Sequence, residues 1–144
     1  MKIRQFVCEY HFLSNFYERP IEYRGLTYNN SEAAFQAQKC LTEEEKQVFT
    51  TMRPGPAKRL GRKVELRPDW EEIKNGLMED VVREKFTQHE DLKQLLLATG
   101  DAELEEGNDW GDDYWGVILE TGKGRNELGK ALMKVRAELA ARQV

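Results

Sequence analysis

Residues 69–89 read DWEEIKNGLMEDVVREKFTQH, and the apolar residues of this stretch recur every three or four positions. Trp70, Ile73, Leu77 and Val81 consequently share one face of a helix. The acidic residues at its start follow the capping-box pattern, in which two side chains satisfy the free backbone N–H groups of a first turn. The stretch therefore predicts a long amphipathic helix, and helices are expected to dominate the fold.

Further helices are predicted on both sides of this stretch, each from a capping residue or a helical spacing of apolar residues. They cover residues 31–41, residues 42–53, residues 56–62, residues 91–99 and a last helix through residues 128–139.

The N-terminal third is expected to be more irregular and partly β. Loose alternation of apolar residues predicts a strand over Ile3–Tyr10. Ile21–Tyr23 and Leu26–Tyr28 alternate around Arg24-Gly25, which predicts a short hairpin. The pattern indicates a mainly α fold with a few short strands, at the borderline of the α+β class, in a single domain over residues 1–144.

The size and charge of the chain exclude several classes of protein. Its 144 residues fit one domain, and a hydrophobic content of 40% argues against a disordered tail. The net charge of −4 argues against broad, nonspecific coating of nucleic acid. No apolar run approaches the roughly 20 residues that span a bilayer. Cys8 and Cys40 cannot form a dense disulfide framework and lack zinc-site spacing with His11 and His89, so we expect a cytoplasmic protein without a structural metal.

The predicted helix over residues 31–39 places reactive groups on one face. At 100° per residue, Glu32, Phe35, Gln36 and Lys39 share that face. The backbones of Glu32 and Lys39 would lie about 10 Å apart, so a small ligand fits between a carboxylate and an amine. An ordinary surface helix is the competing interpretation, because charged residues of helices are mostly exposed.

The segment 106–126 holds five of the eleven glycines together with Asp and Trp residues, and long loops of this kind are usually functional. Asp112 near Trp115 could bind a ribose and stack its base, since carboxylates are natural partners of an oxocarbenium-like transition state. Alternatively, Asp112 caps a turn and Trp115 belongs to the core. The turn Gly122–Asn126 could bind phosphate through its N–H groups, or be a solvated loop.

Taken in order, several motifs resemble the YbiA-like family, whose domains are also called NADAR domains. The motifs are Phe12-Leu13-Ser14-Asn15-Phe16, Ser31-Glu32-Ala33-Ala34-Phe35-Gln36-Ala37-Gln38-Lys39, Gly61-Arg62, Trp70 with Met78, Lys85-Phe86, Asp112-x-x-Trp115-Gly116, and Asn126-x-Leu128-Gly129 with Leu132-Met133 and Arg136. The resemblance covers nearly the whole chain, and the motif beginning at Ser31 is its most specific piece. Val117–Glu120 departs from it, because this segment has the pattern of a strand where some relatives have a polar loop.

The resemblance implies an orthogonal helix bundle with a few short strands, and an N-glycosidase that needs no metal or cofactor. One branch of the family hydrolyses phosphorylated intermediates of the riboflavin pathway and releases ribose 5-phosphate. Another branch removes ADP-ribose from guanine bases of nucleic acid. Both cleave the C1′–N bond of a ribose that carries a 5′-phosphate, so the leaving base stays open. A non-catalytic module that binds ADP-ribose or a nucleotide is the alternative from another class.

The resemblance also implies three catalytic residues. Glu32 matches the acidic residue of the helix motif, Lys39 its lysine, and Asp112 the acid before the Trp-Gly pair. Lys39 would either bind phosphate or form a Schiff base with C1′ of the opened sugar. Because Asp109 and Asp113 stand close by in the sequence, either of them could take the role of Asp112.

Ten substrate-binding candidates complete the predicted site. They are Ser14, Asn15, Phe16, Gln36, Arg62, Trp70, Asp113, Trp115, Gly116 and Asn126. Arg62 and the turn ending at Asn126 are the phosphate candidates, and Phe16, Trp70 and Trp115 are the stacking candidates, although the spacing of Trp70 also fits the core. We expect a monomer that acts on a small phosphorylated N-riboside or on ADP-ribosylated guanine, without a membrane partner.

Overall fold

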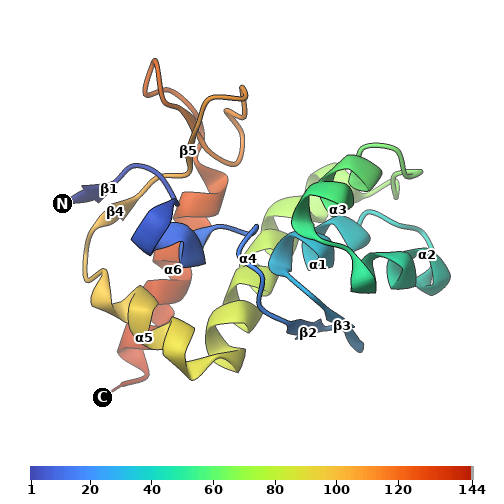
Figure 1. Ribbon diagram of the computed structural model, residues 1–144, viewed down its shortest axis with the longest axis horizontal. Helices are drawn as coiled ribbons and strands as arrows, with labels where there is room; N and C mark the ends of the chain where they lie inside the picture. The colour runs from blue at the N-terminus through green and yellow to red at the C-terminus, as the bar shows by residue number, and fades with distance from the viewer. Residues whose placement is uncertain (144) are drawn as a thin grey trace. The chain divides into compact units, whose positions relative to one another are not determined.

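Helices form about half of the described chain, and the strands are short. The computed structural model describes residues 1–143, and Figure 1 labels its elements. In chain order they are β1 (Lys2–Ile3), the 3₁₀ helix η1 (Cys8–Leu13), β2 (Ile21–Tyr23), β3 (Leu26–Tyr28), α1 (Ser31–Ala37), α2 (Glu43–Gln47), the 3₁₀ helix η2 (Val48–Thr51), α3 (Pro54–Gly61), α4 (Trp70–Gln88), α5 (Glu90–Ala98), β4 (Glu103–Leu104), β5 (Gly107–Asn108), β6 (Val117–Ile118) and α6 (Glu127–Ala141). The predicted mainly α fold with a few short strands is confirmed.

The described chain groups into two compact units. The first unit combines residues 1–14 with residues 89–143, and the second unit is the continuous segment 15–88. Each unit has its own buried apolar side chains, such as Leu104 and Leu132 in the first and Tyr28 and Phe49 in the second. The assignment of residues 1–144 to a single domain stays a prediction.

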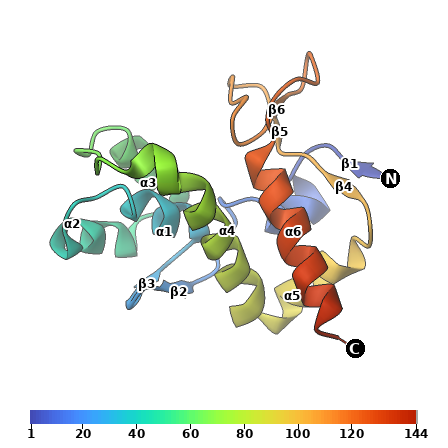
Figure 2. The ribbon, with the colours of Figure 1, turned by 180° about the vertical axis from the view of Figure 1, so that it is seen from behind.

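Helix α1 is the central element of the second unit. It packs against α3, α4 and η2, and all seven of its residues are buried. Ala33, Ala34 and Ala37 are fully covered, because their short side chains let the neighbouring helices approach closely. Figure 2 shows α1 from behind, lying beside α3 and α4. The polar residues of α1 are consequently buried together with its apolar ones.

The predicted hairpin of the second unit is confirmed. β2 and β3 pair antiparallel, with Ile21 opposite Tyr28 and Tyr23 opposite Leu26. The connecting Arg24 and Gly25 have φ values of 51° and 88°. Two positive φ values are typical of a tight hairpin turn that matches the twist of the strands.

The predicted long helix over 69–89 is observed as α4. Its buried face carries Trp70, Leu77 and Val81, as the apolar spacing indicates. Lys85 is buried on the same helix, with its amine 5.1 Å from the Phe86 ring centre and 5.5 Å from that of Tyr17. Burial lowers the pKa of the Lys85 amine to about 7, because a desolvated ammonium is disfavoured.

Two local predictions are wrong. The strand expected over Ile3–Tyr10 is limited to β1, which pairs parallel with β4, and the chain then turns into η1. The helix expected over 31–41 ends at Ala37. The side-chain amide of Gln38 donates to the carbonyl of Ala34 at 2.9 Å and competes there with helical backbone pairing, so the following residues form a tight turn.

Boundaries differ elsewhere by smaller amounts. α3 begins at Pro54 rather than at residue 56, because Pro54 itself takes the first helical position, where its missing N–H is not needed. The helix predicted from Thr42 onward is split into the α-helix α2 and the 3₁₀ helix η2. Thr42 caps α2, since its hydroxyl accepts the Glu45 N–H at 3.2 Å.

In the first unit, α6 packs against α5 and β4. The segment 106–126, predicted as one long loop, contains β5 and β6, which pair in parallel. The predicted strand over Val117–Glu120 is thereby observed in its first two residues. The side chain of Asn108 braces the connection, because it donates to the Asp112 carbonyl at 2.8 Å and accepts the Asp112 N–H at 2.9 Å.

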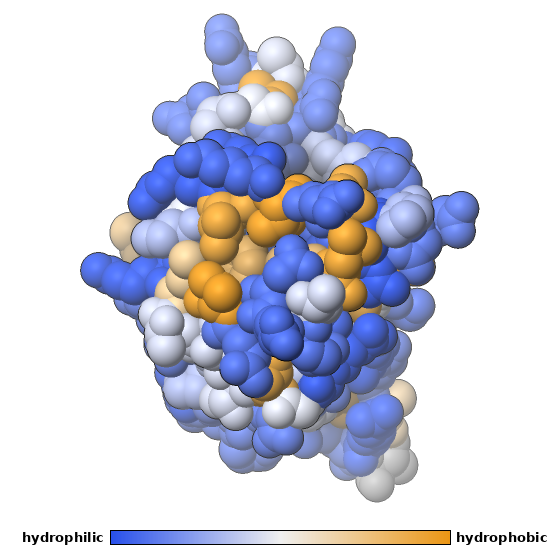
Figure 3. Space-filling model, turned by 90° about the vertical axis from the view of Figure 1, so that its right-hand side faces the viewer, coloured by the Kyte–Doolittle hydropathy of each residue, from blue (hydrophilic) through white to orange (hydrophobic). Residues whose placement is uncertain are grey.

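The surface is largely hydrophilic on the face shown in Figure 3, where hydrophilic residues surround a group of apolar ones. Large apolar side chains of the second unit that are exposed include Phe16, Leu41, Val48 and Leu66. Within residues 1–143, no helix is both long and apolar enough to cross a membrane.

The start of α1 offers a test of the packing. The Asn30 side chain is fully buried, accepts the Ala33 N–H at 2.7 Å and donates to the Met52 carbonyl at 2.9 Å. Asn30→Ala should therefore lower the free energy of unfolding by about 2–3 kcal/mol, because a cap and a buried hydrogen bond are lost together. Thr42→Ala, at the exposed cap of α2, is the matched control and should cost about 1 kcal/mol or less. Urea unfolding measures both, and equal losses would contradict the role of Asn30.

Candidate functional site

Two buried polar residues of α1 are linked to each other. Gln36 donates its side-chain amide to a carboxylate oxygen of Glu32 at 3.1 Å, one helical turn away. Glu32 is 8% exposed and Gln36 is 7% exposed, so α1 is not the ordinary surface helix of the competing interpretation. A buried carboxylate is disfavoured unless donors surround it, and the Gln36 amide supplies one of them.

The amine of Lys39 lies in the same unit, in the turn that follows α1. Lys39 is half-buried, and its Nζ donates to the Gly61 carbonyl at 3.3 Å and lies 5.7 Å from the centre of the Trp70 ring. Burial lowers the pKa of the Lys39 amine below its usual value of 10.5. The Glu32 carboxylate opposes this shift, whereas the cations of Arg62 and Lys74 add to it. A larger fraction of neutral, nucleophilic amine follows at neutral pH.

Trp70 lies in the core, which is one of the two interpretations of its position in the sequence. It is the first residue of α4, is 5% exposed, and packs against Phe35 of α1 with ring centres 5.2 Å apart. Burial makes it part of the core of the second unit. Its contact with the ammonium of Lys39 is a cation–π arrangement, which places the indole beside this candidate residue.

The remaining candidates of the second unit separate into buried and exposed positions. Asn15 is buried, donates to the Met78 sulfur at 3.3 Å and accepts the Ser31 hydroxyl at 3.2 Å. The Asn15 carbonyl accepts the Glu32 N–H at 3.1 Å, so this residue supports the start of α1. Phe16 is exposed and lies under the amine of Lys58, and Arg62 is exposed at the end of α3.

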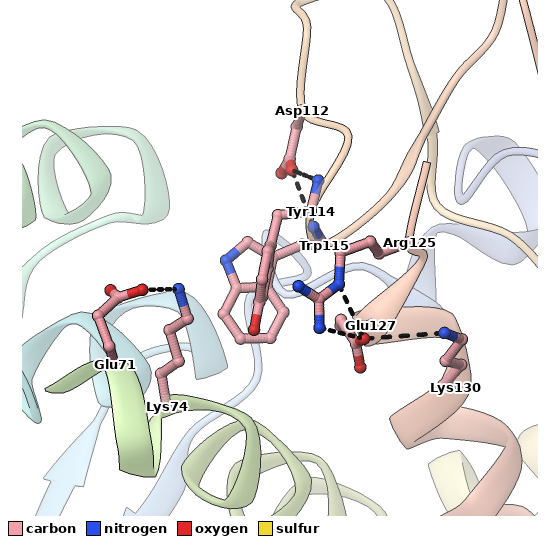
Figure 4. Close-up of polar contacts among 8 residues, drawn as sticks. All are labelled: Glu71, Lys74, Asp112, Tyr114, Trp115, Arg125, Glu127 and Lys130. Carbon is pink, nitrogen blue, oxygen red and sulfur yellow. Dashed lines mark hydrogen bonds and ion pairs between the residues drawn. The ribbon is translucent and has the colours of Figure 1, made fainter. Parts of the chain in front are cut away.

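In the first unit, Asp112 caps a turn. One carboxylate oxygen accepts the N–H groups of Tyr114 at 3.1 Å and Trp115 at 2.9 Å, as Figure 4 shows. This is the turn-capping alternative of the sequence analysis, and it fixes the backbone that carries the aromatic pair. Within residues 1–143, the second carboxylate oxygen of Asp112 has no hydrogen-bond donor, and the neighbouring Asp113 is exposed.

The aromatic pair after Asp112 consists of Tyr114 and Trp115, and Arg125 packs on the first of them. The rings of Tyr114 and Trp115 meet edge to face with centres 4.8 Å apart, and both residues are half-buried. The guanidinium of Arg125 lies 4.5 Å from the Tyr114 ring centre and pairs with Glu127 at 3.2 Å. Figure 4 shows Glu127 also facing Lys130 at the start of α6, and Glu71 paired with Lys74 in the second unit.

Asn126 and Gly116 shape the backbone of this loop. Asn126 has the left-handed φ of 56°, and its buried side chain accepts the Glu106 N–H at 3.0 Å and donates to the Leu104 carbonyl at 2.8 Å. A side chain at Gly116 would collide with the Glu106 carbonyl. Both residues thus have structural roles that account for their presence. Ser14, the last substrate-binding candidate, is half-buried at the end of η1.

Within the second unit, the structure brings together Glu32, Gln36, Lys39 and Trp70. Within the first, it brings together Asp112, Trp115, Gly116 and Asn126. Sequence reasoning missed Gly61 and Asn108 as parts of these clusters. In the sequence, Gly61 has no predicted role of its own and is named only in the motif Gly61-Arg62. Asn108 carries no periodic signal, because its role is to bind backbone groups of a turn.

Comparison with known proteins gives consistent results. The family model of the NADAR domain matches residues 4–140. The "N-glycosidase YbiA" of Escherichia coli (strain K12) is 42% identical over 135 residues, which cover 92% of this chain and 83% of the relative. A "Riboflavin biosynthesis protein" of Vibrio vulnificus is 43% identical over 132 residues, covering 89% of this chain and 35% of that protein.

A solved structure gives the same result for the fold. The NMR structure of the E. coli protein YbiA superposes with a TM-score of 0.87 at 39% sequence identity. The match covers 99% of this chain and 86% of the other. Agreement at this level supports the order of helices and strands described above.

Substitution tests the turn-capping role of Asp112. Asp112→Asn keeps an oxygen that accepts the two N–H groups, so the free energy of unfolding should stay within about 0.5 kcal/mol of the parent. Asp112→Ala removes the cap and should cost about 1–2 kcal/mol. Asp113→Ala, at the exposed neighbour, serves as the control. Thermal or urea unfolding measures all three, and equal stability of the Asn and Ala variants would show that the cap contributes nothing.

Proposed function

The chain belongs to the NADAR domain family, and on that basis we propose that it is an N-glycosidase. It hydrolyses the C1′–N bond between a 5′-phosphorylated ribose and a nitrogen base or amine. The curated relative that covers most of the chain bears the name N-glycosidase. The observation that carries the proposal is the cluster of Glu32, Gln36 and Lys39, in which a buried carboxylate and an amine of lowered pKa occupy one unit.

Glu32 is the proposed proton donor or acceptor for the substrate. Breaking a C1′–N bond leaves positive charge on C1′ and the ring oxygen, and the leaving base needs a proton. A carboxyl group held by a neighbouring amide keeps a defined direction, which acid–base catalysis requires.

Lys39 is the proposed nucleophile. Its neutral amine attacks C1′, and the base departs with the electron pair of the C1′–N bond and a proton. Opening of the ring, with a proton placed on its oxygen, leaves an imine between C1′ and Nζ. Water then hydrolyses the imine, which frees the sugar phosphate and restores the amine. The lowered pKa of Lys39 supports this role over simple phosphate binding, which needs only a charged ammonium.

Asp112 is the proposed second carboxylate, which stabilises the developing cation or orients water. One of its oxygens is occupied by the turn, and the other is available for such a contact. Trp115, directly after the capped turn, is the proposed stacking surface for the base.

A small phosphorylated N-riboside is the proposed substrate class. The riboflavin biosynthesis relative supports it, and so does the acidic net charge of −4, which disfavours extended contact with nucleic acid. Incubation with the pyrimidine ribose-phosphate intermediate and, separately, with an ADP-ribosylated guanine oligonucleotide tests the choice. Chromatography should detect free base and sugar phosphate from the first. Tight binding without products would instead favour a non-catalytic module.

Substitution of the buried acid tests its role. Glu32→Gln preserves size and hydrogen bonding but cannot exchange a proton, so kcat should fall by roughly 10²–10⁴-fold with the fold retained. Glu44→Gln, at an exposed position of α2, is the control and should match the parent. Steady-state turnover and circular dichroism provide the measurements, and near-parental turnover of Glu32→Gln would remove Glu32 from the mechanism.

Trapping with borohydride tests the covalent step. Reduction during turnover should attach the sugar phosphate to Lys39, and mass spectrometry should locate it there and not on exposed Lys63. Because burial lowers the pKa of Lys39, the yield should rise with pH and level off below 10.5, the usual lysine value. Lys39→Gln should abolish the adduct. Turnover without any adduct on Lys39 would exclude the Schiff base.

A further inference from the structure

We infer that Gly61 is a positioning residue of the site, because it fixes both the amine of Lys39 and the amide that supports Glu32. The inference rests on the proposed N-glycosidase function for its kinetic readout. Gly61 is the last residue of α3, is buried, and faces the reactive cluster from a helix other than α1. It acts through the Lys39 amine and the Gln36 amide, and in the proposed mechanism no bond forms or breaks at Gly61 itself.

The first contact is made by the backbone. The Gly61 carbonyl accepts a hydrogen bond from Lys39 Nζ at 3.3 Å. Carbonyls in the last turn of a helix lack intrahelical partners and carry partial negative charge. The end of α3 therefore gives the long, flexible lysine side chain a fixed acceptor within the second unit.

The second contact depends on the missing side chain. A Cβ atom built on Gly61 would collide with Gln36 Oε1 and lie 2.7 Å from its Cδ. Gln36 is buried, so its amide cannot swing freely into solvent. The Gln36 amide donates to the Glu32 carboxylate at 3.1 Å, and displacing the amide breaks this hydrogen bond. Only glycine lets α3 approach α1 closely enough to keep both contacts.

Backbone freedom is not the reason for glycine at this position. The φ of Gly61 lies outside the left-handed region, so alanine would fit its backbone. Gly76 is also helical, in the interior of α4, but a Cβ there would meet nothing within 4 Å. Gly76→Ala is consequently a control for a helical Gly→Ala change that causes no collision.

The predicted defect is one of geometry. Gly61→Ala must either move the Gln36 amide, which supports Glu32, or separate α3 from α1, which moves the carbonyl that accepts the Lys39 amine. Misplacement of catalytic groups by about 1 Å can cost 10²-fold in rate. We expect kcat to fall at least tenfold with KM changed less than threefold, while Gly76→Ala keeps parental values.

A double-mutant cycle shows whether Gly61 acts through Gln36. In a Gln36→Ala background the collision is gone, so adding Gly61→Ala should change kcat by less than twofold. This pair also remains informative if Gly61→Ala alone does not fold, since the second background has room for the methyl group.

Amine labelling provides a readout that does not need turnover. Pulsed acetylation with acetic anhydride at a series of pH values, analysed by mass spectrometry, gives the titration midpoint of Lys39, with exposed Lys63 as internal reference. Separation of the helices relieves burial, so the Lys39 midpoint should shift upward toward 10.5 in Gly61→Ala and stay unchanged in Gly76→Ala.

These results distinguish the two proposals. If the parent protein hydrolyses neither substrate, the proposed function fails, and the labelling midpoint alone decides the role of Gly61. An unchanged Lys39 midpoint in Gly61→Ala would show that α3 and α1 have not separated, and it would overturn the part of the inference that concerns Lys39. In an active enzyme, parental kcat for Gly61→Ala would also overturn it, as would an equally large loss when Gly61→Ala is added to Gln36→Ala.

Discussion

The burial of a carboxylate within α1 is the constraint on which the second unit depends. Every residue of this helix is covered, and a charged group in such a setting is costly unless donors and cations lie near it. The Gln36 amide and the Lys39 amine meet this need from α1 and the turn after it. The neighbouring helices must then be shaped around these side chains as well as around the alanines. The burial of Glu32 therefore determines both how the helices pack against α1 and which polar groups must lie beside its carboxylate.

In the first unit, the main constraint is that a loop rich in glycine and aspartate must be held in one conformation. Side chains do this by binding backbone groups: Asn108 bonds both the N–H and the carbonyl of Asp112, and Asp112 in turn caps the Trp115 turn. The parallel pairing of β5 with β6 adds to this support. A loop held in this way presents Trp115 in a restricted orientation, which would lower the entropy cost of the proposed stacking contact.

The long helix over 69–89 and the hairpin at Arg24-Gly25 were predictable, because each depends on local spacing or turn chemistry. The helix motif also indicated that the charges of Glu32 and Lys39 lie near each other, although α1 ends before Lys39. That early end depends on the Gln38 amide, which competes with the backbone and has no periodic signature. The contact between Gly61 and Gln36 joins residues 25 positions apart, so no local pattern contains it. Long-range contacts of this kind decide the geometry of the candidate site.

Asn126 restricts what evolution can place at its position. Its left-handed backbone favours glycine, asparagine or aspartate, since other side chains are strained there. Glycine would leave the Glu106 N–H and the Leu104 carbonyl without their partner. Aspartate would direct a second acceptor at the Leu104 carbonyl, where a donor is needed. Asparagine alone meets both demands. Homologous chains should therefore keep asparagine at this single position, even where the surrounding loop diverges in length and composition.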